Sequence, residues 1–389
     1  MLFVGHPMEY TKLKNINEYK SETVNPIKYP DTVFEMYSVP IYDTGHPEYL
    51  RGSEIGSSKV IVRKNDVLIC KINPRINRVW VVSDESEYQN IASSEWIVVR
   101  SSTYNPYYLA WYFRSKRFKG LMISEVTGIG GSLTRAQPKA VAEYPVPIVS
   151  QNRQFYIVDV LNRINSIITA RRQELLRLDE LIKARFVEMF GDESNPYQWP
   201  VISVADVANV SVGVVIKPAQ YYTDAEHGIK AFRSLNIGPM TIKDGDWVYF
   251  SYEGNVKNAK SQLKENDLLI VRSGAPGTAC VVPKQYEGCN AIDIIIARPN
   301  TKQINPYYLC MYTNMPHGKR QIKEGTGGAA QQHFNVGKYN KLQLMLPPMS
   351  LQKEFVDFIA LIDKSKTEVQ KSLDEAQLLF DSLMQQYFG

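Results

Sequence analysis

Lysine and arginine side chains are unevenly distributed along this chain, and residues 59–78 hold a dense group of them. Ammonium and guanidinium groups bind anions, and the formal net charge of +5 is a mild indication of an anionic partner. The stretch 71–78, which also contains two asparagines, is too polar to belong to a core. The basic residues of this region, accompanied by the single acid Asp66, are Lys59, Arg63, Lys64, Lys71, Arg75 and Arg78.

A second candidate for chemistry is Asn105-Pro106-Tyr107-Tyr108, which occurs again at residues 305–308. It invites comparison with the Asn-Pro-Pro-Tyr motif of amino-methyltransferases, in which the Asn grips the target amine and the ring stacks on a flipped base. Here the second Pro is missing and a helical pattern follows directly. We therefore interpret each copy as the start of a helix, with Asn as N-cap, Pro at the first helical position and the aromatic rings packed inward.

The rest of the sequence offers little for catalysis or metal binding. The Gly-rich stretches 127–132 and 326–329 do not fit a nucleotide-binding frame, so each is either a tight turn or a loop whose backbone N–H groups approach phosphate. We predict no catalytic residue and no metal site, which favours a binding protein over an enzyme. The histidines are isolated and lack the spacing of metal ligands: His6, His46, His227, His317 and His333.

Much of the sequence is repeated within the chain. The segment 105–109 returns 200 residues later, and residues 66–69 recur as 267–270. Such a period is too long for a solenoid and indicates a duplicated module with a pseudo-twofold relation. Farther along, Pro147, Ser150 and Phe155 are matched with Pro347, Ser350 and Phe355.

Two long helices must position the modules. In residues 151–190 the apolar positions alternate in steps of four and three, which is typical of a coiled-coil seam, and Gly191 ends the pattern. At 1.5 Å per residue such a helix is about 60 Å long. The seam residues are Ile157, Leu161, Ile164, Ile168, Leu175, Leu178, Ile182 and Met189, with Arg171 and Arg185 as polar exceptions.

The C-terminal residues repeat this design. A lone helix cannot keep such an apolar stripe in water, so we expect the two helices to form an antiparallel pair, with a bundle involving another protein as the alternative. The second seam consists of Phe355, Ile359, Ile362, Val369, Leu373, Ala376, Phe380, Leu383 and Tyr387, with Lys366 as the polar exception.

Short β-branched and aromatic runs predict strands at 60–62, 67–70 and 79–82, and at 248–250, 268–271, 279–282 and 292–296. One helix is expected over 107–123. No apolar run reaches the ~18–20 residues of a membrane span, and no signal-peptide pattern is evident, so we expect a cytoplasmic protein. The cysteines are expected to be buried free thiols: Cys70, Cys280, Cys289 and Cys310.

This layout resembles the specificity subunits of type I restriction–modification systems. The shared marks are a strand–turn segment such as 267–274, Asn-Pro-Tyr-Tyr-Leu opening a helix, a loop containing Thr-Gly, and a Pro-containing entry into each long helix. The resemblance implies an α+β protein with two mixed, β-rich target-recognition domains separated by two long antiparallel coiled-coil-like helices. The expected boundaries are 1–149 and 193–349 for the recognition domains and 150–192 and 350–389 for the helical spacers.

Within this family, side chains near strand–turn junctions are candidates for DNA contacts. Arg and Lys can bind guanine O6 and N7, and amides can pair with adenine. Half or more of the candidates could equally face solvent, and phosphate contacts usually outnumber base contacts. The candidates in the first module are Lys71, Asn73, Arg75, Asn77, Arg78, Arg135, Gln137 and Lys139, and those in the second are Arg272, Ser273, Gln331, Gln332 and His333.

The resemblance further implies a non-catalytic subunit that directs DNA methylation in a restriction system. Each domain would read one half of an asymmetric, bipartite site in double-stranded DNA, while the helices set the gap. Two methyltransferase subunits would dock near the helices, and whether restriction subunits join stays open. S-adenosylmethionine, ATP and Mg²⁺ are expected only on these partners, and no membrane is involved.

Two other functions stay open at this level. One is a self-sufficient DNA methyltransferase that uses the Asn-Pro-Tyr-Tyr segments, and it would have to bind S-adenosylmethionine by itself. The other is a coiled-coil scaffold that binds proteins without reading DNA. A DNA reader loses affinity steeply as salt rises, whereas a scaffold has no such DNA affinity.

Overall fold

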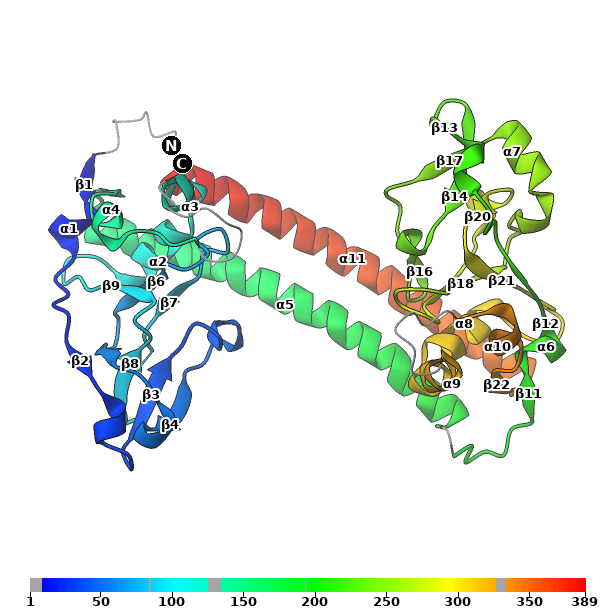
Figure 1. Ribbon diagram of the computed structural model, residues 1–389, viewed down its shortest axis with the longest axis horizontal. Helices are drawn as coiled ribbons and strands as arrows, with labels where there is room; N and C mark the ends of the chain where they lie inside the picture. Colours follow the sequence, from blue (N-terminus) through cyan, green and yellow to red (C-terminus); the bar gives the residue numbers. More distant parts are fainter. Residues whose placement is uncertain (1–8, 84, 125–133, 193, 327–333) are drawn as a thin grey trace. The chain divides into compact units, whose positions relative to one another are not determined.

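The structure is a computed structural model that describes residues 9–83, 85–124, 134–192, 194–326 and 334–389 (Figure 1). The chain divides into two compact units. Unit 1 consists of Met1–Arg172 and Gln370–Gly389, and unit 2 consists of Gln173–Val369. Each unit therefore combines one β-rich module with segments of both long helices.

The two long helices are α5 (Gln151–Phe190) and α11 (Met349–Phe388), each 40 residues in length. Their existence and their ends agree with the apolar periodicity. Gly191 ends α5 in the left-handed region at a φ of +84°, and a Cβ there would lie 2.5 Å from Pro196 Cδ. A glycine is thus required at this position, both for its backbone conformation and for space.

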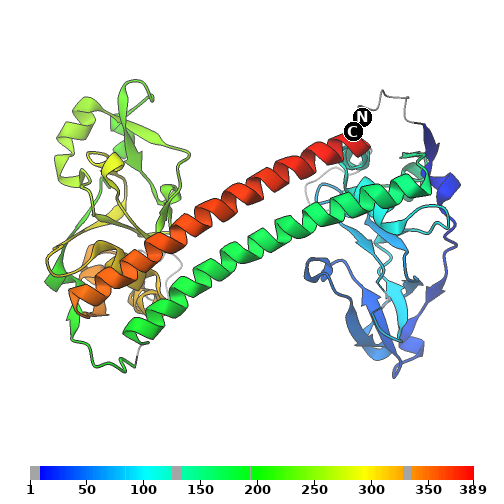
Figure 2. The same ribbon diagram turned by 180° about the vertical axis from the view of Figure 1, so that it is seen from behind.

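Within each unit the helix segments run antiparallel and side by side, as both views show (Figure 2). In unit 2, Asp179 Oδ1 accepts from Lys366 Nζ at 2.7 Å and Glu354 Oε1 accepts from Arg185 Nη2 at 3.0 Å. In unit 1, Arg172 Nη2 donates to Gln377 Oε1 at 3.2 Å. The Arg153 guanidinium, near the start of α5, lies over the ring of Tyr387 at the other end of α11.

The apolar seam lies along these contacts. Leu161 and Ile168 are buried, whereas Leu175 and Leu178, near the middle of α5, are only half-buried. The seam is therefore best packed where a module covers the helices. Its other members are buried at Ile157, Ile164, Ile182, Phe355, Ile359, Ile362, Val369 and Tyr387 and half-buried at Met189, Leu373, Ala376, Phe380 and Leu383.

The described residues of unit 1 form three sheets. A five-stranded sheet has the order β2 (Thr23–Val24), β5 (Lys59–Ile61), β8 (Gln89–Ala92), β3 (Val33–Tyr37), β4 (Glu48–Arg51), in which only β3 and β8 are parallel. A three-stranded sheet has the order β7 (Val79–Val81), β6 (Val67–Cys70), β9 (Trp96–Val99), and β1 (Tyr10–Lys12) pairs with β10 (Pro145–Pro147). The helices are α1 (Leu13–Ile16), α2 (Pro106–Arg114), α3 (Lys116–Ser124) and α4 (Pro138–Val141), with 3-10 turns η1 (Pro26–Lys28), η2 (Tyr42–Thr44) and η3 (Gly52–Glu54).

Unit 2 repeats this plan with variations. One sheet has the order β12 (Ala208–Val212), β21 (Ile294–Pro299), β18 (Leu268–Val271), β19 (Ala279–Val281). Another has the order β13 (Tyr222–Thr223), β17 (Val248–Ser251), β14 (Gly228–Phe232), β20 (Asn290–Ala291), and β14 and β20 are again parallel. The pairs β15 (Ile237–Gly238) with β16 (Thr241–Ile242) and β11 (Val201–Ser203) with β22 (Gln343–Met345) complete the strands. The helices are α6 (Val204–Val207), α7 (Tyr252–Lys257), α8 (Pro306–Asn314), α9 (Pro316–Thr326) and α10 (Val336–Asn340), with 3-10 turns η4 (Pro218–Tyr221), η5 (Ser234–Asn236), η6 (Ala259–Ser261) and η7 (Lys284–Tyr286).

The predicted strands occur in the structure, but the single helix expected over 107–123 is wrong. The chain forms α2 and α3 there, and the break lies at Ser115, whose ψ is 153°. Ser115 Oγ accepts from Phe118 N at 3.2 Å and so caps α3. In unit 2 the break falls at Met315, which precedes Pro316 and is therefore disfavoured in the helical region.

Equivalent polar pairs establish the internal repeat. Asp66 is buried and binds the Arg100 guanidinium through two hydrogen bonds of 2.7 Å, and it also accepts from Arg63 N at 2.8 Å. In unit 2, Asp267 binds Arg298 in the same way, at 2.8 and 2.7 Å. The predicted α+β class with a duplicated module and antiparallel helices is confirmed.

The matching of Pro147, Ser150 and Phe155 with residues 200 later is wrong. Asn105 N donates to Gln154, 49 residues on, whereas Asn305 N donates to Gln352, only 47 residues on. The second copy is shorter by two residues in this interval, so Phe355 is equivalent to Ile157. Phe355 and Ile157 are both buried, whereas Phe155 is 60% exposed.

A test of the repeat framework is the substitution Asp66→Ala. It should lower the free energy of unfolding by about 2–3 kcal/mol, because a half-buried guanidinium and a backbone N–H lose charged hydrogen bonds. Arg63→Ala is the matched control, since its ion pair with Glu22 is mostly exposed, and it should cost less than about 1 kcal/mol. Urea denaturation would measure both, and equal losses would contradict the assigned role of Asp66.

Aromatic rings join each module to the C-terminal end of one of the long helices, α11 in unit 1 and α5 in unit 2. In unit 1, Phe388 of α11 lies 5.5 Å from Tyr108 and Phe380 lies 5.5 Å from Trp111, between ring centroids. In unit 2, Phe190 of α5 lies 4.9 Å from Tyr308. The hydrophobic core of each unit is therefore shared between a module and both helices.

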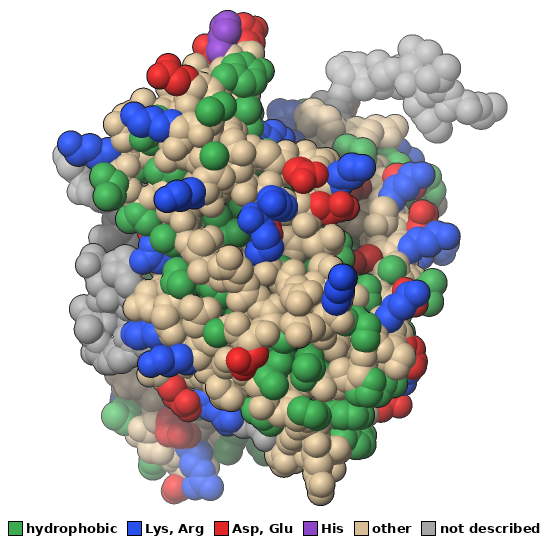
Figure 3. Space-filling model, turned by 90° about the vertical axis from the view of Figure 1, so that its right-hand side faces the viewer, with side chains coloured by type: hydrophobic (Ala, Val, Ile, Leu, Met, Phe, Trp, Pro, Cys, Tyr) green, Lys and Arg blue, Asp and Glu red, His purple; other side chains and the backbone are tan. Residues whose placement is uncertain are grey.

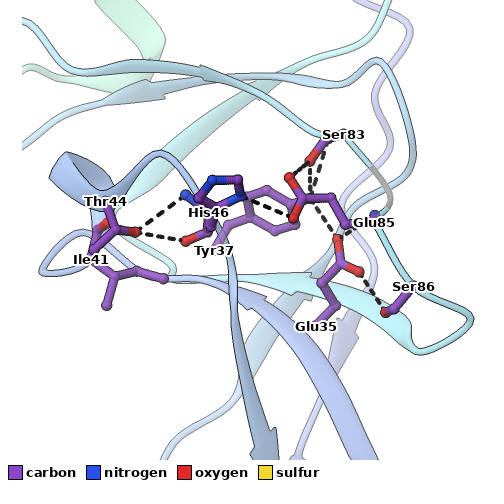
Figure 4. A network of polar contacts seen from close by, with 8 residues as sticks. All are labelled: Glu35, Tyr37, Ile41, Thr44, His46, Ser83, Glu85 and Ser86. Carbon is purple, nitrogen blue, oxygen red and sulfur yellow. Dashed lines mark hydrogen bonds and ion pairs between the residues drawn. The ribbon is translucent and has the colours of Figure 1, made fainter. Parts of the chain in front are cut away.

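Unit 1 also contains a buried carboxylate on β3. Glu35 is fully buried and accepts from Tyr37 Oη at 2.7 Å, Ser86 Oγ at 2.6 Å and Glu85 N at 3.1 Å (Figure 4). The Oε2 atom of Glu85 in turn lies 3.2 Å from His46 Nδ1, within hydrogen-bond distance. The Glu35 side chain is satisfied internally and anchors residues 85–86 to the sheet, which is a structural role.

The predicted state of the cysteines is confirmed, because Cys70, Cys280, Cys289 and Cys310 are all free and buried. No helix in the described ranges combines the length and apolar character needed to cross a membrane.

Candidate nucleic-acid interface

The loop 71–78 joins β6 to β7 and is built from two consecutive turns. Asn73 and Asn77 adopt positive φ angles of 46° and 53°, a conformation that asparagine tolerates better than most residues. Ile76 N donates to Asn73 O at 2.9 Å, and Asn77 N donates to Pro74 O at 3.1 Å. The loop therefore holds Arg75 and the 55% exposed Ile76 outward in a defined conformation.

The segment that precedes α4 lies against this loop. Asn73 N donates to Thr134 O at 2.9 Å, and Ala136 N donates to Lys71 O at 2.9 Å. Ile72 and Arg135 form an isolated β-bridge. The structure thus brings together Lys71, Asn73 and Arg135, candidates that lie about 60 residues apart in the sequence.

Three further candidates lie at the edges of this group. Gln137 and Lys139 are exposed at the start of α4. Arg78 is half-buried beside β6, where its carbonyl accepts from Cys70 N at 3.0 Å. Burial raises the pKa of the Cys70 thiol, which disfavours its reactive thiolate form.

Sequence reasoning missed the acid at the centre of the group. Glu95 Oε1 lies 3.1 Å from Arg135 Nη2, and its Oε2 lies 3.9 Å from Lys71 Nζ. Lys71 also donates to Ser94 O at 2.7 Å. Glu95 directly precedes β9, which pairs with β6, so only the strand register reveals the contact. It neutralises part of the positive charge of the group.

Unit 2 has the same ion pair at the same place. Arg272 follows β18 as Lys71 follows β6, and its Nη1 pairs with Oδ1 of Asp293, which precedes β21. Arg272 Nε also donates to Phe334 O at 3.2 Å, and the side chain is only 17% exposed. Arg272 is therefore held in the framework, with Ser273 half-buried next to it.

The remaining candidates, Gln331, Gln332 and His333, lie outside the described residues, as do both Gly-rich stretches except Thr326. On the face shown in Figure 3, lysine and arginine side chains are scattered among acidic and apolar ones and do not form one continuous basic patch.

The interpretation of the Asn-Pro-Tyr-Tyr segments as helix starts is confirmed. Asn105 Oδ1 accepts from Tyr107 N at 2.9 Å and from Tyr108 N at 3.3 Å, and Asn305 Oδ1 accepts from Tyr307 N at 2.9 Å. Of the aromatic rings predicted to pack inward, those of Tyr108 and Tyr308 are fully buried, but the prediction is wrong for Tyr107 and Tyr307, which are 47% and 37% exposed. Neighbouring residues of a helix point to different sides, so only one tyrosine of each pair faces the core. The amide oxygen that a methyltransferase motif would use is therefore occupied by capping.

Large apolar side chains are also exposed on the outer faces of the helix segments. In unit 1, Phe155 is 60% exposed and Leu378 is 71% exposed, and in unit 2 Leu176 and Leu361 are 63% and 68% exposed. These side chains lie outside the packed seam, on parts of the helix surface that are open to solvent.

The comparisons with known proteins agree with this architecture. A family model described as the type I restriction modification DNA specificity domain matches residues 174–377. No curated protein matches the chain. A solved structure titled as the structural basis of complex assembly and conformational transition of the type I R-M system is similar over 99% of both chains, with 15% identity and a TM-score of 0.63.

A second solved structure is the S subunit of a type I restriction–modification system from M. genitalium. It is similar over 100% of this chain and 98% of its own, with 12% identity and a TM-score of 0.58. At these identities the structural matches establish the fold, while the family model covers more than half of the residues. The chain therefore belongs to the type I restriction–modification DNA specificity family, as an S subunit.

Proposed function

We propose that this chain reads a split, asymmetric site in double-stranded DNA, one half with each unit, for a type I complex. The observation that carries the proposal is that the two units share a framework of strands but differ in the loop that follows β6 in unit 1 and β18 in unit 2. Loop 71–78 offers lysine, asparagine and arginine side chains, whereas loop 272–278 has small residues after Arg272. Because different side chains pair with different base edges, the two half-sites should differ.

The first half-site is assigned to the module of residues 1–149 and its candidates from Lys71 to Lys139. We assign base contacts to Arg75, and its exposure at the loop tip supports this assignment. Lys71 and Arg135 share Glu95, which suits them to positioning on phosphate. The second half-site is assigned to residues 193–349, with Ser273 and residues 331–333 as candidates and Arg272 supporting the loop.

The helical segments 150–192 and 350–389 are assigned two tasks. Their length sets the number of unread base pairs, and their exposed apolar side chains dock two methyltransferase subunits. S-adenosylmethionine, ATP and Mg²⁺ would be bound by partner subunits, so this chain remains non-catalytic. The match to a structure described as a type I assembly supports partners of this kind.

The direct test is to co-express the full chain with the methyltransferase subunit encoded next to it and to map N6-methyladenine across the host DNA. A bipartite motif that appears only when this chain is present is the expected result. Methylation without the chain, or none with an active partner, would refute the proposal and favour a scaffold without DNA readout.

The readout assignment can be tested with Arg75→Ala. Loss of one base contact should weaken cognate binding by about 1–3 kcal/mol, roughly 5- to 150-fold, and relax one position of the first half-site only. Arg63→Ala is the matched control, because Arg63 is exposed in the same module but lies before β6 rather than after it. Fluorescence anisotropy at fixed salt would measure both, and a uniform loss across all sequences would reassign Arg75 to phosphate.

A further inference from the structure

Unit 2 contains a cavity of about 480 Å³ between its module and the two helix segments. Its walls come from α5, α11, α8 and the start of α9, and from the turn between β15 and β16. The apolar part of the lining is made by Ile182, Met240, Met311, Met315 and Ile359. A largely apolar pocket with a few polar groups is the usual form of a small-ligand site.

The internal repeat shows what the equivalent space holds in unit 1. Phe388 packs on Tyr108 as Phe190 packs on Tyr308, so Phe380, eight residues before Phe388, is equivalent to Ile182. By the same repeat, Trp111 is equivalent to Met311.

In unit 1 the Trp111 indole packs edge to face on Phe380 and donates from Nε1 to Asn162 Oδ1 at 2.9 Å. Unit 2 has smaller side chains at both positions, Met311 and Ile182, and methionine is also the more flexible of the two. The cavity therefore lies where the other unit accommodates an indole ring.

The polar lining provides an ammonium group without an acidic partner. Lys319 Nζ donates to Thr278 Oγ1 at 3.2 Å, and no carboxylate in the described part of the chain forms an ion pair with it. Burial lowers the pKa of Lys319 to about 8. An anion that reached this group would therefore meet a poorly hydrated positive charge.

The other charged groups of the lining largely offset each other. Asp179 is paired with Lys366 at 2.7 Å, and burial raises the pKa of Asp363. Lys183 and Tyr307 also line the cavity. An anionic ligand group is thus favoured at Lys319 and opposed near the two aspartates.

We propose that this cavity binds a planar aromatic ring that carries a carboxylate, with the ring beside Met311 and the carboxylate on Lys319. The proposal does not depend on DNA reading. Its chemistry fits either a free aromatic acid or a protein segment in which an aromatic residue neighbours an acid.

The experiment titrates N-acetyltryptophan into the full chain labelled with ¹³C at the methionine methyl groups. Shifts should concentrate at Met240, Met311 and Met315, which line the cavity, among 11 methionines in the chain. N-acetyltryptophanamide, which lacks the carboxylate, should bind about tenfold more weakly because it cannot form the charge-assisted hydrogen bond. Binding of the acid should fall as the pH rises above about 8, where Lys319 loses its proton, and binding of the amide should not.

Two variants test the two parts of the site separately. Lys319→Met should abolish the difference between acid and amide, whereas Lys264→Met, an exposed lysine outside the cavity, should leave it unchanged. Met311→Trp introduces the residue found at the equivalent position of unit 1 and should remove binding of both probes by filling the cavity. Ile182→Phe is a second variant that should fill the cavity.

The dipeptide N-acetyl-Trp-Asp-amide distinguishes the two sources of the ligand chemistry. Tighter binding than that of the free acid would indicate a protein segment, and weaker binding would indicate a small molecule. Absence of shifts at the three methionines with all the probes, or undiminished binding to folded Met311→Trp, would overturn the proposal.

Discussion

Removing seven residues from each long helix, 171–177 and 371–377, should shorten the gap in the methylated motif by about three base pairs and leave both half-sites unchanged. Seven residues are two helical turns, so the apolar seam keeps its phase, and the loss of length is about 10 Å at 1.5 Å per residue. Base pairs are spaced about 3.4 Å apart along the duplex. The original motif should no longer be methylated.

The deleted segments were chosen because each contains one partner of the same hydrogen bond and because the seam of α5 is weakly packed there. Arg172 bonds to Gln377, and both are removed together, while Leu175 is only half-buried. Methylome sequencing reads the new gap directly. Deletion of 171–177 alone is the control, since it mismatches the pair and should give no methylation. An unchanged gap in the double deletion would show that the helices do not set the spacing.

The second large effect is expected from Phe190→Ala, which should destabilise unit 2 by about 3–5 kcal/mol. The Phe190 ring is fully buried and lies 5.0 Å from Phe186, 4.9 Å from Tyr308 and 5.4 Å from Phe355, between centroids. Truncation leaves a cavity where helix and module meet, and the rigid aromatic neighbours cannot collapse into it.

Hydrogen exchange provides a readout specific to one unit, which matters because two units need not unfold together. Amide protection should fall in α8 and stay unchanged in α2, the equivalent helix of unit 1. Val187→Ala, at a 43% exposed position of the same helix, is the control and should cost less than about 1 kcal/mol. Equal loss of protection in α2 and α8 would contradict the assignment of Phe190 to the core of unit 2 alone.

The sequence by itself determined the features that rest on local chemistry. Apolar residues at steps of four and three can be buried only on one face of a helix, and Gly191 has no alternative at its position, so α5 could be placed to its ends. The Asn105 and Asn305 side chains cap helices by accepting from the backbone N–H two residues later. Their role could therefore be predicted from the four-residue segment alone. Buried runs such as 67–70 gave their strands for the same reason.

The sequence led to wrong predictions where two residues of the same type were taken to have the same environment. Phe155 and Phe355 share an identity, yet only Phe355 is buried, because two residues fewer separate α8 from the following strand in the second copy. The break at Ser115 was also missed, since a serine within an apolar pattern becomes a cap only when its hydroxyl meets the N–H of Phe118.

Tertiary structure alone decided the chemistry of the candidate site. Glu95 reaches Lys71 and Arg135 because β9 pairs with β6, and Asp293 reaches Arg272 because β21 pairs with β18. These contacts join residues more than 20 positions apart, and no periodicity encodes them. The cavity beside Met311 exists for the same reason, since its volume depends on side chains that arrive from several elements at once.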